Sequence, residues 1–328
     1  MKKKHLLVSL LLACGAISAQ AADKLTFQLD WLPTGGDKAF VYAGVGEGFY
    51  AAEGLEVTIL PGRGSADAIT KIASGAADVG SGGLSALMVA AAEGGVPVKA
   101  VMSVYSKQPD ALFTLEGGPI TDLESLIGKT VAMPTFSSSN TTWPVFLKDN
   151  GIDPDAVKTL KTDPSTMAPM LAQGRVDATI NWTTVAPGYA AVLKQAGKEL
   201  RVIPWSEYGL NGYGLSLFAS QALIDKKPEV VERFVRASKK AMEFALANPA
   251  KAAEHQKSLV PEADVVTLEA DMRASAPLVD NEISEKDGLG TFTPELLSGT
   301  WSWVARSMGY PSDKIDPESV VDHSFQNK

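Results

Sequence analysis

The chain has 328 residues, 45% of them hydrophobic and 21% charged, a length that suits about two domains with sizeable cores. Its formal net charge of −8 argues against nucleic acid or an anionic membrane surface as a partner. The only cysteine, Cys14, precludes an internal disulfide, so the fold must be stabilised by packing.

The N-terminus has the features of an export signal. A basic start, a short apolar stretch and an A-x-A motif at residues 19–21 match a secretory signal, and the apolar stretch is too short to span a bilayer. We therefore expect a signal peptide at residues 1–21 and a periplasmic mature protein. Alternatively, residues 11–15 approximate a lipoprotein signal, in which Cys14 would carry a lipid anchor.

The first folded unit is predicted to be a strand, a loop, a helix and a second strand. Apolar and polar side chains alternate over residues 25–29, which is typical of a strand, and Asp37 can cap a helix over residues 38–53. A strand over residues 55–60 completes a β-α-β unit, the building block of a parallel sheet. Because such sheets bind ligands at the C-terminal ends of their strands, Asp30 and Trp31 are candidate ligand contacts.

Two further loops are expected at the same edge of this sheet. Gly64 and Ser65 precede a predicted helix, and N–H groups at a helix start can hold an oxyanion or a ligand carbonyl. A plain glycine turn is the alternative. Ser81 and Gly82 follow a predicted strand in the same way, so both pairs should face the loop at Trp31.

The second half of the chain offers another set of polar loops. Gly128-Lys129-Thr130 resembles the end of a phosphate-binding loop, but the upstream glycine that this motif needs is Leu123, which excludes it. The hydroxyl-rich loop at 134–142 follows a predicted strand. Its candidate ligand contacts are Thr135, Ser138 and Asn140, with a solvated loop as the alternative.

The combination of a helix, a G-x-x-D motif and a strand is predicted once in each half of the chain, with the motif at Gly75 and at Gly174. Each copy follows a predicted helix and begins a predicted strand. The second strand ends at Asn181 and Trp182, where the first ends at Ser81. This pseudo-repeat predicts two similarly built lobes, joined by short crossings near residues 105–114 and 212–219.

Several of these motifs together resemble a known family. LDWLP, GFYAAEGLEVTI, GRGS and GAADVGSGG are similar to periplasmic solute-binding proteins of ABC importers, most of all those for thiamine pyrimidine precursors, with sulfonate and taurine binders as near relatives. The resemblance runs from about residue 25 to about residue 214. It implies an α/β fold of the type II periplasmic-binding-protein architecture, with two lobes, each a mainly parallel sheet flanked by helices, and a ligand cleft between them.

We assign residues 22–108 and 215–328 to lobe one and residues 109–214 to lobe two. The expected function is capture of a small, planar organic solute (a pyrimidine-like compound, a sulfonate or an aromatic acid) and its delivery to an ABC permease. No cofactor, metal, catalytic residue or nucleic acid is expected, and the protein should be a monomer.

The expected ligand contacts are drawn from both lobes. Trp31 and Trp182 would present two aromatic faces to a planar ligand. Asp37 departs from the family pattern, in which a histidine is expected about six residues after the tryptophan. It would suit a ligand N–H or cationic group, or would only cap the helix. The full set is Asp30, Trp31, Asp37, Gly64, Ser65, Ser81, Gly82, Thr135, Ser138, Asn140, Asn181, Trp182 and Glu207.

The alternative function is a pyrimidine-forming or other low-turnover enzyme on the same scaffold. The sequence lacks G-x-S-x-G, H-E-x-x-H and C-x-x-C motifs, so serine-triad, zinc-protease and thiol chemistry lack their components. Such an enzyme would need a reactive lysine or histidine in the cleft. Lys38 is the only nearby basic residue, and we expect it to be solvated.

Overall fold

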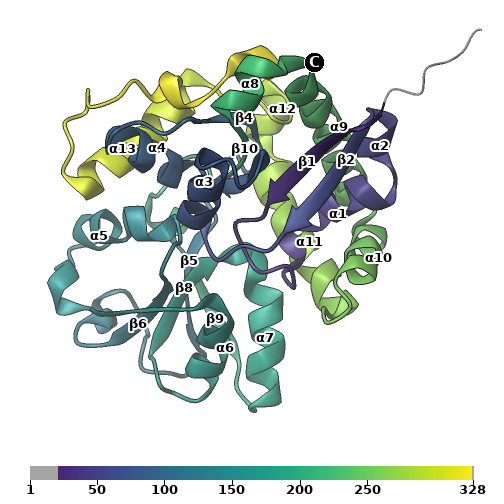
Figure 1. Cartoon of the computed structure of the whole chain (residues 1–328). Coiled ribbons are helices and arrows are strands. Elements are labelled where there is room, and N and C mark those ends of the chain that lie inside the picture. Colours follow the sequence, from purple (N-terminus) through teal and green to yellow (C-terminus); the bar gives the residue numbers. More distant parts are fainter. Residues whose placement is uncertain (1–20, 327–328) are drawn as a thin grey trace, which may run out of the picture.

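The computed structural model describes residues 21–326, which form two α/β lobes stacked one above the other in Figure 1. The predicted signal peptide, apart from its last residue, and the anchor candidate Cys14 lie outside the described residues. Within residues 21–326, no helix is both long and apolar enough to cross a membrane.

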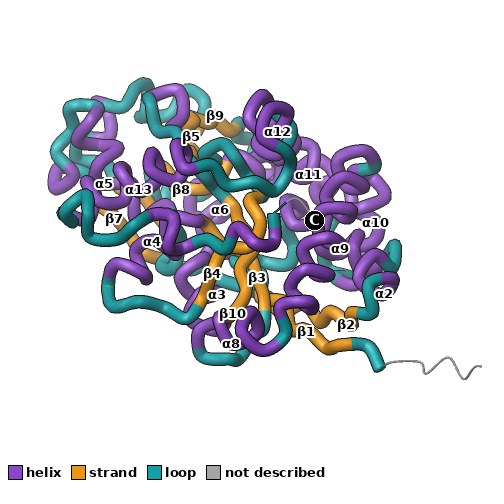
Figure 2. The backbone as a smooth tube through the Cα atoms, turned by 90° about the horizontal axis from the view of Figure 1, so that it is seen from above, coloured by secondary structure: helices purple, strands orange, loops and turns teal. Residues whose placement is uncertain are grey.

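Lobe one is built on a five-stranded sheet in the order β2-β1-β3-β10-β4. Strands β1 to β3 are parallel to one another, whereas β10 runs antiparallel to both of its neighbours. Figure 2 shows β3, β10 and β4 side by side from above. The strands are β1 (Asp23–Gln28), β2 (Leu55–Leu60), β3 (Val79–Gly83), β4 (Val98–Ser103) and β10 (Leu215–Ser220).

Lobe two repeats this plan in a sheet of order β7-β6-β8-β5-β9. Here β5 is the reversed strand between β8 and β9. The reversed strand of each sheet is therefore the one that enters from the other lobe. The strands are β5 (Asp110–Leu115), β6 (Thr130–Pro134), β7 (Lys158–Thr162), β8 (Ala178–Trp182) and β9 (Leu200–Pro204).

Helices cover both faces of each sheet. Those of lobe one are α1 (Ala39–Gly46), α2 (Phe49–Ala52), α3 (Ser65–Ala73), α4 (Leu84–Ala92), α8 (Gln221–Lys226), α9 (Pro228–Ala247), α10 (Pro249–Leu259), α11 (Val265–Val279), α12 (Glu282–Asp287) and α13 (Pro294–Met308). Those of lobe two are α5 (Ser139–Asp149), α6 (Pro164–Ala172) and α7 (Ala186–Gln195). Short 3₁₀ turns are η1 (Gly36–Lys38), η2 (Glu124–Leu126), η3 (Pro154–Ala156), η4 (Thr183–Val185), η5 (Trp205–Tyr208), η6 (Pro317–Val320) and η7 (His323–Phe325).

The two G-x-x-D motifs have the same structural role in the two lobes. The carboxylate of Asp78 accepts a hydrogen bond of 2.8 Å from the N–H of Thr26, within β1. The carboxylate of Asp177 accepts the equivalent bond, also 2.8 Å, from the N–H of Thr130 at the start of β6. Asp78 thus fastens β3 to β1, and Asp177 fastens β8 to β6.

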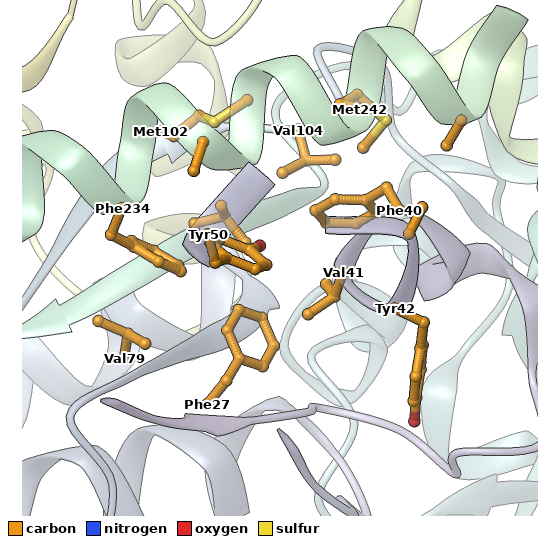
Figure 3. Packing of buried hydrophobic residues seen from close by; sticks show 14 of the residues in the cluster. Phe27, Phe40, Val41, Tyr42, Tyr50, Val79, Met102, Val104, Phe234 and Met242 are labelled. Carbon is orange, nitrogen blue, oxygen red and sulfur yellow. The ribbon is translucent and has the colours of Figure 1, made fainter. Parts of the chain in front are cut away.

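One core cluster of lobe one lies between its sheet and helices α1, α2 and α9, and another lies between the sheet and helices α3, α4 and α13. Figure 3 shows Phe27 from the sheet close to Tyr50 and Phe234 from the helices. The rings of Tyr50 and Phe234 stack with their centroids 5.9 Å apart. These residues are buried, and burying each large apolar side chain contributes about 1.5–3 kcal/mol.

The two polypeptide crossings between the lobes lie side by side. The N–H of Gly214, just before β10, donates to the carbonyl oxygen of Tyr105, just after β4, at 2.9 Å. The N–H of Val104 donates to Leu215 at 2.9 Å. Paired crossings of this kind allow the lobes to hinge as two bodies.

Three local predictions need correction. The helix predicted over residues 38–53 is divided, because Gly48 has φ of +75° and separates α1 from α2. Helix α5 begins at Ser139, inside the segment predicted to be a loop. Strand β7, which was not predicted, forms one edge of the lobe-two sheet.

Candidate functional site

A cavity lies at the boundary of the lobes, beyond the C-terminal ends of parallel strands in both sheets. This is where open α/β sheets bind ligands. From lobe one it is lined by the loop after β1, by η1 and by the loop before α3; from lobe two, by the loop after β6 and by the end of β8 with η4. The lining residues are Asp30, Trp31, Asp37, Lys38, Gly64, Ser65, Ser137, Asn181, Trp182 and Val185.

Three charged side chains are buried together on the lobe-one side. The ammonium of Lys38, which is only 1% exposed, lies 2.6 Å from Asp37 Oδ2 and 3.4 Å from Asp30 Oδ1. Burial alone would lower the pKa of Lys38, but the negative charges of Asp30 and Asp37 outweigh it and raise the pKa. Lys38 is therefore protonated, and two acidic side chains face its single ammonium.

The carboxylate of Asp30 is held from behind by β3. Ser81 Oγ donates to Asp30 Oδ1 at 2.7 Å and accepts from the Asp30 N–H at 3.3 Å. Gly82 lies beside Ser81, and a Cβ there would be 2.6 Å from the Phe218 ring and 3.3 Å from Ser65 Cβ. Ser81 and Gly82 therefore support the site without lining the cavity.

Asp37 reaches across the boundary. Its Oδ2 accepts a hydrogen bond of 3.2 Å from Thr184 Oγ1, which belongs to lobe two, in addition to the bond from Lys38. Its Oδ1 is buried and has no hydrogen-bond partner among the described residues. The same is true of Asn181 Oδ1. Two unsatisfied acceptors thus belong to side chains that line the cavity.

Each cavity tryptophan packs against the core of the opposite lobe. Trp31, from lobe one, contacts the lobe-two cluster around Phe113, and Trp182, from lobe two, contacts the lobe-one cluster around Tyr105. The Lys38 ammonium lies 5.1 Å from the centroid of a Trp182 ring, a cation–π distance. Both indoles are half-buried, so part of each ring remains open to the cavity.

The lobes touch around this cavity. The N–H of Ala66 donates to the carbonyl oxygen of Phe136 at 3.1 Å, and a Cβ on Gly64 would come within 2.4 Å of the same residue. Gly64 therefore permits the close approach of the two lobes. The enclosed volume is about 20 Å³, which is space for a water rather than for a ring.

Helix α11 adds a second bridge between the lobes. Asp271 accepts hydrogen bonds from Gly36 N–H of lobe one, at 3.1 Å, and from Gly188 N–H of lobe two, at 3.2 Å. Burial raises the pKa of Asp271 to about 7, although the two N–H donors oppose the rise. Burial thus favours the protonated form of Asp271, whereas the two N–H donors favour the ionised form.

Four of the proposed contacts do not line the cavity, in addition to Ser81 and Gly82. Asn140 bonds to the carbonyl oxygens of Pro134 and Thr135, at 2.9 Å and 3.1 Å, and so holds its own loop. Thr135 is exposed, and its hydroxyl lies 3.4 Å from the Thr162 oxygen. Ser138 is buried against Gly83 of lobe one. Glu207 is exposed on η5.

Sequence reasoning missed three lining residues, Lys38, Ser137 and Val185. The expectation that Lys38 is solvated is wrong. A lysine next to an aspartate at the start of an apolar helix resembles a solvated helix end. The available signal was the nearly complete lack of other polar side chains in that helix, which indicates a buried environment.

The profile of the family described as NMT1/THI5 like matches residues 36–252. The chain belongs to this family. The match contains most of the cavity lining, including Asp37, Lys38, Asn181 and Trp182.

Relatives of this NMT1/THI5-like chain include both binding proteins and enzymes. It is 29% identical to the riboflavin-binding protein RibY of Chloroflexus aurantiacus, over 87% of this chain and 81% of that one. It is 26% identical to the formylaminopyrimidine-binding protein of Halalkalibacterium halodurans, over 76% and 77%. It is also 27% identical to the 4-amino-5-hydroxymethyl-2-methylpyrimidine phosphate synthase THI13 of Saccharomyces cerevisiae, over 71% and 70%.

The fold is shared with solved periplasmic binding proteins. The alkanesulfonate-binding protein SsuA of Xanthomonas axonopodis, bound to MOPS, superposes with a TM-score of 0.72 at 14% identity, covering 93% of this chain and 99% of that one. This agreement confirms the predicted two-lobed α/β architecture of the NMT1/THI5-like chain. At such low identity it shows the fold alone.

Proposed function

We propose that the protein is the extracytoplasmic solute-binding component of an ABC importer, and that it binds a neutral, planar nitrogen heterocycle with N–H donors in the cleft between its lobes. The observation that carries this proposal is the pair of unsatisfied acceptors, Asp37 Oδ1 and Asn181 Oδ1, on side chains lining a cavity with an indole from each lobe. An unsatisfied buried acceptor costs about 1–3 kcal/mol, which a ligand N–H would recover.

The charges around the cavity favour a neutral ligand over a sulfonate. Asp30 and Asp37 outnumber Lys38, whose ammonium is already engaged by both carboxylates. Among the described residues that line the cavity there is no arginine. A sulfonate would thus meet a negative environment without a free cation in this lining, and like charges at close range repel.

The relatives support the heterocycle class. Two relatives are named for binding riboflavin and formylaminopyrimidine, which are planar nitrogen heterocycles. Planar rings suit two indole faces, because offset or edge-to-face aromatic contacts add to the burial of apolar area. A taurine-binding periplasmic protein of Escherichia coli is 30% identical over 62% of this chain and 64% of that one, a shorter match than the other two. The choice of a heterocycle over a sulfonate therefore rests on the charges around the cavity.

We propose binding without turnover, although the yeast relatives are named as synthases. A lysine that forms a Schiff base must lose its proton. The raised pKa of Lys38 keeps it protonated and paired. Treatment with pyridoxal phosphate and borohydride, followed by peptide mapping, should therefore leave Lys38 unmodified even where exposed lysines such as Lys24 react. An adduct on Lys38 would favour the enzyme alternative.

Export and a permease partner complete the proposal. The signal-like residues 1–21 support release into the periplasm, with lipidation at Cys14 as the alternative. N-terminal sequencing of the mature protein separates these two forms. The lobe division at residues 108/109 and 214/215 and the monomeric state are part of the same proposal.

A thermal-shift comparison tests the ligand class. Riboflavin and 4-amino-5-hydroxymethyl-2-methylpyrimidine are compared with taurine and MOPS at equal concentrations. A ligand that binds only the native state raises the melting temperature by mass action. We expect at least one heterocycle to raise it and neither sulfonate to do so. The opposite pattern would overturn the heterocycle assignment.

A further inference from the structure

Asp110 is the first residue of β5 and follows directly on the crossing from lobe one. It lies opposite Trp182 in the antiparallel pairing of β5 with β8. The N–H of Thr183 donates to the Pro109 oxygen at 2.8 Å and fixes this register. Side chains directly opposite in such a pair project to the same face of the sheet.

Two neutral donors meet at the Asp110 carboxylate. Ser139 Oγ, from the first turn of α5, donates to Oδ1. The side chain of Trp182, whose indole N–H is a donor, lies opposite Asp110 and opposes the rise in the pKa of its carboxyl group. An indole has one donor, at its edge. Holding this edge therefore fixes the rotation of the ring about its side-chain bonds.

Asp110 is costly to bury. It is 3% exposed, and no lysine, arginine or histidine of residues 21–326 forms an ion pair with it. Burial raises the pKa of Asp110 to about 7, against the hydrogen bonds from Ser139 and Trp182. A buried carboxylate without a cation is a poor means of stabilising a fold. A carboxylate buried in this way points to a role in the site.

The indole opposite Asp110 is the one that faces the cluster of charges. Trp182 lines the cavity, and Lys38 lies 5.1 Å from its ring centroid. Tyr105, on the crossing before β5, meets the ring edge-on, with centroids 5.9 Å apart and an interplanar angle of 67°. The ring is thus restrained at its edge by lobe two and by contacts from lobe one.

We propose that Asp110 is a positioning residue, whose carboxylate holds the indole of Trp182 by its N–H edge and keeps the ring in place for a planar ligand in the cleft. The part of this proposal that concerns the ligand rests on the proposed function. The part that concerns the indole geometry does not. Binding contacts held by such supporting hydrogen bonds keep their geometry, whereas unsupported ones sample several rotamers. Because Asp110 directly follows the crossing, it also links the Trp182 ring to the segment about which the lobes hinge.

The competing explanation is that Asp110 serves only Ser139 and the start of α5. The two explanations differ at the indole. If Asp110 acts through Trp182, loss of the carboxylate must change the environment of that indole N–H. If it serves only α5, loss of Ser139 Oγ must have the same consequences as loss of the carboxylate.

The test uses the mature protein with ¹⁵N-labelled tryptophan and records the indole N–H signals, with Trp182 identified by its loss in Trp182→Phe. We expect Asp110→Asn to move the Trp182 indole proton upfield, because a neutral amide oxygen is a weaker acceptor than a carboxylate. We expect Ser139→Ala, the matched control, to leave that signal in place. Titration with riboflavin or 4-amino-5-hydroxymethyl-2-methylpyrimidine should show binding about 3- to 10-fold weaker for Asp110→Asn and unchanged for Ser139→Ala.

An unmoved Trp182 signal in Asp110→Asn, or equal weakening of binding in both variants, overturns the proposal. If no heterocycle binds the wild type, the proposed function fails, and the indole signals still decide the role of Asp110. If Asp110→Asn does not fold, hydrogen exchange of the wild-type indoles decides. Slow exchange at Trp182 supports the bond, and exchange as fast as that of a free indole overturns it.

Discussion

Lys38 carries the positive charge in a buried cluster whose other charged members are Asp30 and Asp37. Removing one partner of a buried ion pair leaves uncompensated charge, which typically costs about 3–5 kcal/mol. We expect Lys38→Met, which keeps most of the apolar stem, to lower the free energy of unfolding by roughly that amount. Urea denaturation measures it.

A matched control exists at the surface. Lys24 pairs with Glu56 at 3.9 Å, and its side chain is 81% exposed. Lys24→Met should change the free energy of unfolding by less than about 1 kcal/mol. Equal effects of the two substitutions would show that the cluster at the cleft is not energetically special.

The two cleft tryptophans should contribute to binding through their exposed faces. We expect Trp31→Ala and Trp182→Ala each to cost about 1–3 kcal/mol of binding to whichever heterocycle gives a thermal shift. Trp303→Ala is the control, since Trp303 lies on α13 under Arg306, away from the cavity. Calorimetric titration gives the difference. Wild-type affinity in both cleft variants would mean that the ligand binds elsewhere.

At the residue scale, the sequence located the cleft better than it identified its chemistry. Asp30, Trp31 and Trp182 stand at strand ends, and their position follows from the rule that parallel strands present their C-terminal ends at one edge. The inward orientation of Lys38 could not be predicted in the same way. The orientation of Lys38 depends on two carboxylates that the tertiary structure brings close to its ammonium. For the serine-rich loop at 134–142, the sequence allowed either solvation or ligand contact.

Helix α11 should make stability depend on pH. The pKa of Asp271 is about 7 in the folded protein, against 3.8 as the unperturbed value. Between about pH 4 and pH 7 the folded state therefore holds a proton that the unfolded state has lost. The contribution of Asp271 protonation to the free energy of unfolding is therefore fully present below about pH 4 and is lost as the pH rises through about 7.

The measurement is urea denaturation of the wild type and of Asp271→Asn at about pH 5 and about pH 8. Because the amide does not titrate, the variant should lose less stability between the two pH values than the wild type. Asp110 has a similarly raised pKa of about 7, so part of the slope should remain. Identical slopes in the two proteins would contradict the pKa assigned to Asp271.

Close packing of η1 on α11 gives a second test at the scale of elements. A Cβ on Gly36 would lie 2.0 Å from the carbonyl oxygen of Leu268, so the two elements would have to move apart. We expect Gly36→Ala to destabilise the protein by about 1–3 kcal/mol or more. Gly299 lies within α13, and a Cβ added there would have no atom within 4 Å, so Gly299→Ala should stabilise by about 0.5–1 kcal/mol. Thermal unfolding of both variants checks the two signs.

Secondary structure was predictable where one periodic pattern dominated. The strands of both G-x-x-D motifs follow from apolar pattern and helix-ending glycines. The break at Gly48 was not evident, because glycine within an apolar helix is tolerated until tertiary packing demands a turn. Strand β7 was missed because KTLKT lacks a long apolar run, although lysines are typical of an edge strand.

At the scale of the molecule, the lobes exchange aromatic contacts across the cleft, and the enclosed space of about 20 Å³ is too small for a heterocycle. A solute must therefore enter with the lobes further apart, through motion about the paired crossings at residues 104–109 and 209–214. A ligand that contacts both lobes then stabilises the closed form, because it binds the closed form more tightly than the open form. The lobe plan was predictable from the repeated motif, whereas the contacts that close the cleft depend on residues far apart in the sequence.

The most direct test of heterocycle binding in the cleft is calorimetric titration of ligand-free wild type and of Asp37→Ala with riboflavin, 4-amino-5-hydroxymethyl-2-methylpyrimidine and taurine. We predict that a heterocycle binds the wild type, that taurine does not, and that loss of the Asp37 acceptor weakens heterocycle binding by about tenfold or more. Tight binding of taurine, or heterocycle binding that is unaffected by Asp37→Ala, would contradict the proposed function.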